Sequence, residues 1–116
     1  MAIKSTYTAN KVVDDNLTGT YLTLFSDDPK VDGSGTELLV TRQALSFIPA
    51  VNGEAKNDTQ INYADVPTGT ITHWAIYDAD VDGNLIYFGK FGSPIIFNES
   101  GGQLTIEIND ITIKEE

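Results

Sequence analysis

The chain has 116 residues, of which 41% are hydrophobic, so it can bury the core of one domain and is too apolar for global disorder. It has no cysteine, which excludes disulfides, zinc–thiolate sites and thiol nucleophiles. Seventeen acidic and seven basic residues give a formal net charge of −10, and such a negative field repels nucleic acid and anionic lipid surfaces. We therefore expect no nucleic-acid partner and no membrane partner. Neither the apolar run of a signal peptide nor a stretch long enough to span a membrane is present in the sequence.

The N-terminal segment, residues 1–10, is small and polar apart from Ile3 and Tyr7. This composition is typical of an extended arm that becomes ordered against another surface. We expect Ile3 and Tyr7 to be the interface residues of this arm. A single β-sandwich domain is then expected over residues 11–116.

Turn clusters and β-rich segments alternate after this arm. Residues 10–17 are compatible with two turns of helix that end at Gly19. Residues 20–25 are apolar on both faces, which is typical of a central strand. The Asp, Pro, Gly and Ser residues of 26–36 predict a surface loop, and residues 38–48 predict a strand with a bulge or bend.

The second half of the chain contains the most informative segment, residues 69–91. Two runs rich in Thr, Ile and aromatic residues are joined by an Asp-Gly turn, which predicts a β-hairpin that contains the only His and the only Trp. Further strands are predicted at 59–63, at 91–96 and at 103–109, where apolar and polar residues alternate strictly. Seven or eight short strands with at most one short helix predict an all-β fold, either an antiparallel β-sandwich or a small barrel.

The hairpin turn contains a candidate calcium site, because Asp78, Asp80 and Asp82 are spaced like the first ligands of an EF-hand loop. The twelfth position of such a loop should be Glu, but here it is Gly89, and the flanking segments are typical of strands. The hypothesis is therefore a calcium site of another geometry, and the alternative is an acidic, solvent-exposed turn. No other cofactor is expected.

Catalytic residues are not indicated by any pattern in the chain. His73 could act as a general base, but such a base needs an orienting carboxylate and a nucleophile that the sequence does not identify. The aromatic residues of the hairpin, among them Trp74 and Tyr77, could form a platform for sugar rings or could belong to the core. We expect that the protein is not an enzyme, and a hydrolase is the weakest hypothesis.

The order of several motifs resembles a family of small phage virion structural proteins that are often described as tail-fibre-like. The motifs are structural and span about residues 15–113. They are the strand at 19–25, the Ser-Asp-Asp-Pro turn at 26–29, Gly-Thr-Glu at 35–37, Arg-Gln-Ala at 42–44, and a hairpin formed by 69–73, 83–85 and 88–89. The three aspartates depart from the small polar turn of the family, so an ion site there would be a local addition.

The resemblance implies a non-enzymatic protein located in the virion. The first hypothesis is a capsid decoration or cement protein that binds the major capsid protein and stabilises the shell. We expect contacts with other virion proteins and a homo-oligomer, with a trimer favoured. The alternative is a tail-fibre or tail-tip domain whose loops recognise a host surface glycan or receptor.

Overall fold

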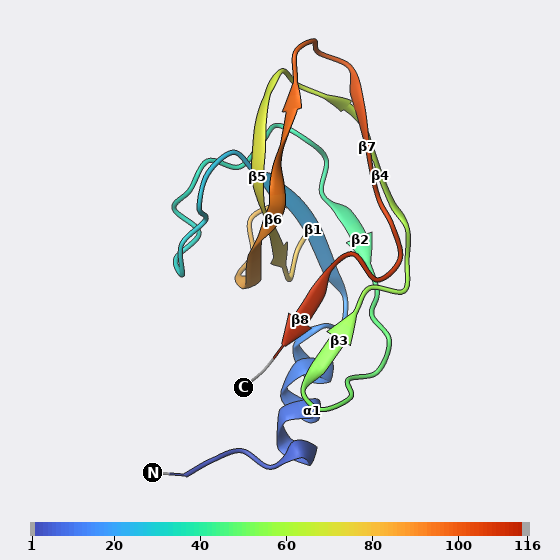
Figure 1. The fold of residues 1–116 in the computed structure, drawn as a ribbon. Coiled ribbons are helices and arrows are strands. Elements are labelled where there is room, and N and C mark those ends of the chain that lie inside the picture. The colour runs from blue at the N-terminus through green and yellow to red at the C-terminus, as the bar shows by residue number, and fades with distance from the viewer. Residues whose placement is uncertain (1, 115–116) are drawn as a thin grey trace.

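A computed structural model describes residues 2–114 (Figure 1). The predicted domain limits at residues 1 and 116 lie outside this range. In chain order, the elements are α1 (Thr6–Asn16), β1 (Thr20–Phe25), β2 (Gln43–Leu45), β3 (Glu54–Lys56), β4 (Ile61–Val66), β5 (Gly69–Tyr77), β6 (Leu85–Phe97), β7 (Gly102–Ile106) and β8 (Thr112–Lys114). Eight strands and one helix in the described part of the chain confirm the prediction of an all-β fold.

The strands form one larger sheet and two small ones, and every pairing is antiparallel. The larger sheet has the order β2-β1-β5-β6, while β3 pairs with β8 and β4 pairs with β7. Figure 1 shows the β4-β7 pair beside the larger sheet, and the sheets do not close into a barrel. The antiparallel prediction is therefore confirmed, and the barrel alternative is not realised.

The core lies between these sheets. Leu22 and Leu24 of β1 and Ile76 of β5 are buried in one cluster with Tyr63 of β4 and Ile106 of β7. The Tyr63 hydroxyl donates a hydrogen bond to the backbone carbonyl of Leu22, which links β4 to the larger sheet. Burial of these apolar side chains supplies the main driving force for folding.

Strand β1 is central, as its sequence predicted. It pairs with β2 on one side and with β5 on the other. Its second face buries Phe25 in a separate cluster with Ala75 and Tyr77 of β5. Both faces of β1 are therefore covered, because side chains of successive residues point to opposite sides of a strand.

The predicted hairpin of residues 69–91 is formed by β5 and β6. Asp82 and Gly83 in its turn have positive φ angles of 58° and 79°, as the Asp-Gly pair predicted. The two segments predicted after this turn are joined in one long edge strand, β6, whose register shifts where Gly92 and Pro94 lie. An edge position tolerates Pro94, because proline has no backbone N–H for a second neighbour.

The N-terminus differs from the prediction of an extended arm over residues 1–10. Helix α1 begins four residues before Asn10, because Ser5 is the N-cap residue and its Oγ accepts a hydrogen bond from the Thr8 N–H at 3.2 Å. The predicted cap residue Asn10 has a different role, since its side chain accepts a bond from the Gly53 N–H at 2.6 Å. The extended part of the arm is therefore short. Within residues 2–114, the only helix is not long and apolar enough to cross a membrane.

Candidate functional site

A groove of about 510 Å³ lies between residues 37–42, which precede β2, and the tip of the β5-β6 hairpin. Its apolar lining includes two strongly exposed side chains, Leu39, which is 93% exposed, and Val81, which is 71% exposed. Asp80 and Asp82 also line the groove and give it an acidic border. Exposed apolar side chains that face the same hollow are typical of a binding surface.

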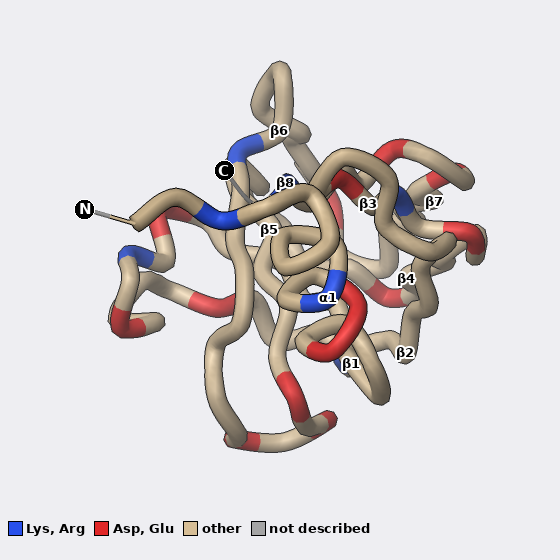
Figure 2. The backbone as a smooth tube through the Cα atoms, turned by 90° about the horizontal axis from the view of Figure 1, so that it is seen from below, with Lys and Arg blue, Asp and Glu red and all other residues tan. Residues whose placement is uncertain are grey.

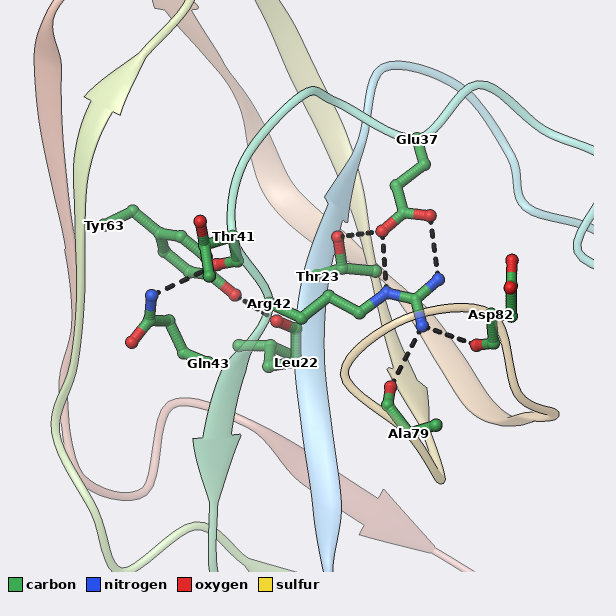
Figure 3. A network of polar contacts seen from close by, with 9 residues as sticks. All are labelled: Leu22, Thr23, Glu37, Thr41, Arg42, Gln43, Tyr63, Ala79 and Asp82. Carbon is green, nitrogen blue, oxygen red and sulfur yellow. Dashed lines mark hydrogen bonds and ion pairs between the residues drawn. The ribbon is translucent and has the colours of Figure 1, made fainter.

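The floor of this groove is organised by Arg42, which Figure 3 shows between two loops and β1. Its guanidinium donates to both carboxylate oxygens of Glu37, with Nε–Oε2 and Nη2–Oε1 distances of 2.9 Å each. Nη1 donates to the backbone carbonyls of Ala79 at 3.0 Å and Asp82 at 2.6 Å. The planar guanidinium makes these contacts in a fork geometry that lysine cannot reproduce.

Two further residues complete the polar network. The Thr23 hydroxyl of β1 donates to Glu37 Oε2 at 2.6 Å. The Arg42 guanidinium lies over the Tyr77 ring, 3.9 Å from its centroid, which is a cation–π contact. The network therefore joins the loop before β2, strand β1, the end of β5 and the hairpin turn.

The pair of Glu37 and Arg42 is charged but internally neutral. Burial raises the pKa of Glu37, but hydrogen bonds from Arg42 and Thr23 and the positive charge of Arg42 outweigh burial and lower it below its ordinary value. The hydrogen bond to Glu37 raises the pKa of Arg42. Because the Arg42 guanidinium is bonded to these partners, its role in the groove is to position the loops. The charge of the border comes from Asp80 and Asp82.

The candidate calcium ligands are not brought together as a set. The carboxylate of Asp78 accepts hydrogen bonds from the Asn84 N–H at 2.7 Å and the Asn84 amide at 2.9 Å, and these bonds lower its pKa. Among residues 2–114, no group of three or more His, Asp or Glu side chains is placed to hold a metal ion. Asp78 thus closes the turn, while Asp80 and Asp82 border the groove. Calcium binding stays a prediction that a titration can test.

The predicted interface residues lie on a different part of the surface. Ile3 is in the extended segment before α1 and Tyr7 is in the first turn of the helix, and both are exposed. Ile3 lines a second hollow together with Asn52 of the β2-β3 connection. Both side chains can be reached by a partner, and their contact with one stays a prediction.

The other candidate residues of the hairpin, His73, Trp74 and Tyr77, are part of strand β5. His73 lies on β5, where its Nδ1 is 2.7 Å from the Thr72 hydroxyl. Trp74 and Tyr77 are buried, so they do not form an exposed platform for sugar rings. This outcome supports the core interpretation of these two aromatic residues.

The sequence analysis missed a buried polar residue, Asn57. Its side-chain amide donates to the carbonyls of Thr59 and Glu107 at 2.9 and 3.0 Å, and its Oδ1 accepts from the Ile111 N–H at 2.8 Å. It thereby joins the β3-β4 connection to the turn before β8. In the sequence it lies in a polar segment that is typical of a surface turn, so no local pattern marked it as buried.

The fold and the groove define a small antiparallel β-domain with an exposed apolar surface that has an acidic border. Its residues 4–114 match the family described as podophage GP4 fiber I protein gp80, and the chain belongs to this family. A search of curated proteins finds no match. Membership of a fibre protein family makes this a structural protein of the phage virion, as the motif resemblance implied.

Proposed function

We propose that the protein is a fibre component of the podophage tail and that it acts by binding, without catalysis. The observation that carries this proposal is the match over residues 4–114, which covers all eight strands and whose description names a fibre. The same description favours the tail-fibre hypothesis over the capsid decoration hypothesis. A decoration or cement protein bound to the major capsid protein is therefore the competing outcome of the experiment below.

The binding part of the proposal is supported by the groove. Leu39 and Val81 offer apolar contact area, and the Arg42 network holds the two loops that present them. Rigid presentation lowers the entropy that a loop loses when it binds. We infer that this surface takes part in binding, because loops placed on a rigid scaffold commonly form binding sites.

Immunogold labelling of intact particles tests the proposed location. We expect gold at the tail, and we expect gels of purified particles to show far fewer copies than of the major capsid protein. Antiserum that has been absorbed with the purified protein is the control for specificity. Gold distributed over the capsid, with a copy number close to that of the major capsid protein, would instead establish a decoration protein.

Incubation with purified host surface polysaccharide tests the absence of catalysis. We expect the polysaccharide to keep its chain length when it is measured by size-exclusion chromatography. A loss of chain length that grows with protein concentration and incubation time would refute the binding-only proposal, even if the fibre location is correct.

A further inference from the structure

The groove of Leu39 and Val81 has a chemistry that restricts what can cover it. Leu39 and Val81 are the exposed apolar side chains of its lining, and the Glu37–Arg42 pair adds no net charge. Asp80 and Asp82 leave its border negative. The complementary partner is therefore a segment that combines exposed apolar side chains with positive charge.

The N-terminal segment of this same chain, defined here as residues 2–11, has that chemistry. Ile3 is 87% exposed and Tyr7 is 74% exposed. The segment contains Lys4 and Lys11 and no acidic residue, in a chain whose net charge is −10. Lys11 Nζ also lies 3.2 Å from Asp15 Oδ2 in an exposed pair on the same helix, so Lys11 would have to exchange this partner to reach the acidic border. Figure 2 shows basic positions along the backbone from the N-terminus into α1, and acidic positions both later in the same helix and on loops elsewhere.

The position of α1 prevents this segment from covering the groove of its own chain. Asn10 and Asp14 hold the helix against the β2-β3 connection through bonds from the Gly53 N–H at 2.6 Å and the Ala50 N–H at 2.8 Å. Figure 1 shows α1 at one end of the molecule, beyond β3 and β8, whereas the groove is formed beside β1 and the β5-β6 turn. Only the few residues before the helix remain extended, so this segment can bind such a groove only on a second copy.

We propose that the N-terminal segment of one copy binds in the groove of a second copy. Ile3 and Tyr7 would pack on Leu39 and Val81, and the lysines of the segment would lie near the acidic border. The two surfaces are different parts of the chain, so the contact is heterologous and builds a closed ring or a linear array. This assembly rests on the groove and the N-terminal segment, and it holds for any location of the protein in the particle.

Light scattering coupled to size-exclusion chromatography of the full chain tests the contact. We expect an oligomer whose mass increases with concentration, and we expect Leu39→Ser or Ile3→Ser to weaken association by about 10- to 100-fold, as the burial of one large apolar side chain implies. Val31→Ser is the matched control, because Val31 is 89% exposed but does not line the groove. All three substitutions are at exposed positions, and circular dichroism verifies that each variant is folded.

A mixing experiment tests whether the contact joins these two surfaces. The Leu39→Ser protein keeps an intact N-terminal segment, and the Ile3→Ser protein keeps an intact groove. A one-to-one mixture should therefore form a dimer through one intact contact, although each variant alone is mostly monomeric at the same concentration.

Three results would overturn the proposal. They are a monomeric parent protein at all concentrations, association that Leu39→Ser does not weaken, and a mixture that stays monomeric. An oligomer that persists with both substitutions would show that the groove is not the contact between copies. The groove would then be open to a different virion protein or a host receptor.

Discussion

Replacement of Arg42 by alanine is expected to destabilise the fold and release the groove loops. The substitution removes two charge-assisted hydrogen bonds to Glu37 and two bonds to the carbonyls of Ala79 and Asp82. Charge-assisted bonds contribute about 1.5–3 kcal/mol each when they are well buried. Glu37 is partly exposed, so water can replace part of this contribution. We therefore expect a total loss of about 2–4 kcal/mol in the free energy of unfolding.

The conservative variant Arg42→Lys separates charge from geometry. Lysine keeps the positive charge, but it cannot donate in parallel to both Glu37 oxygens and still reach the turn carbonyls. We expect it to recover less than half of the stability that Arg42→Ala loses. A double-mutant cycle with Glu37→Gln should give a coupling energy of about 1–3 kcal/mol, since the two side chains are in direct contact.

The same pair should make the effect of Arg42→Ala depend on pH. The pKa of Glu37 is lowered in the folded protein, because its hydrogen bonds and the charge of Arg42 outweigh burial. A lowered pKa contributes stability that is present above the pKa of the unfolded state and is lost as the pH falls through the folded value. The difference between the parent protein and Arg42→Ala should therefore be largest near neutral pH and shrink in acid.

Urea denaturation followed by the fluorescence of Trp74, the only tryptophan, measures these differences. A loss below about 0.5 kcal/mol at neutral pH is the range of ordinary surface substitutions and would refute the role given to Arg42. If Arg42→Ala lowers the free energy of unfolding by the same amount in the Glu37→Gln protein as in the parent protein, the two side chains are not coupled.

Three further substitutions or titrations test other parts of the structure. Asn57→Ala removes three hydrogen bonds to backbone groups and leaves the buried Ile111 N–H without its partner, so we expect a loss of about 3–5 kcal/mol in urea denaturation; a loss under about 1 kcal/mol would contradict its role. Gly89→Ala places a methyl group against the Trp74 indole, and we expect a loss of about 1–3 kcal/mol with a shifted emission maximum, whereas an unchanged spectrum would argue against this packing. Calorimetric titration with millimolar calcium tests the loop: heat that Asp80→Ala abolishes would support a site, and equal heats for both proteins would end the hypothesis.

The candidate site shows how far local patterns reach. The sequence predicted a strand over residues 38–48 with a bulge or bend near Arg42, but the strand is limited to β2 and residues 38–42 form a loop before it. The positive φ angles predicted for the Asp82-Gly83 pair are present, in a longer loop than a tight turn. The sequence did not predict that Arg42 bonds to the carbonyl of Asp82, because the two residues are 40 positions apart. Periodicity and turn propensity describe neighbours in the chain, and neither measures contacts at that separation.

The short-range physical rules account for the elements that were predicted correctly. Residues 20–25 are apolar on both faces and form the central strand β1, and the Asp-Gly turn has the positive φ angles it requires. The helix start was wrong because two residues, Ser5 and Asn10, are both good cap residues. Local propensity could not choose between them, whereas the contact between Asn10 and Gly53 did.

By itself, the sequence determined the fold class, the acidic surface and the motifs of a phage structural protein, since composition, alternation and turn chemistry are local properties. Only the tertiary structure placed Leu39 and Val81 in the lining of one groove, buried Asn57 and gave Asp78 a partner in Asn84. These relations depend on sheet order and strand register, which are set by the packing of the whole core. The groove is therefore a product of the fold, although every residue that lines it can be read in the sequence.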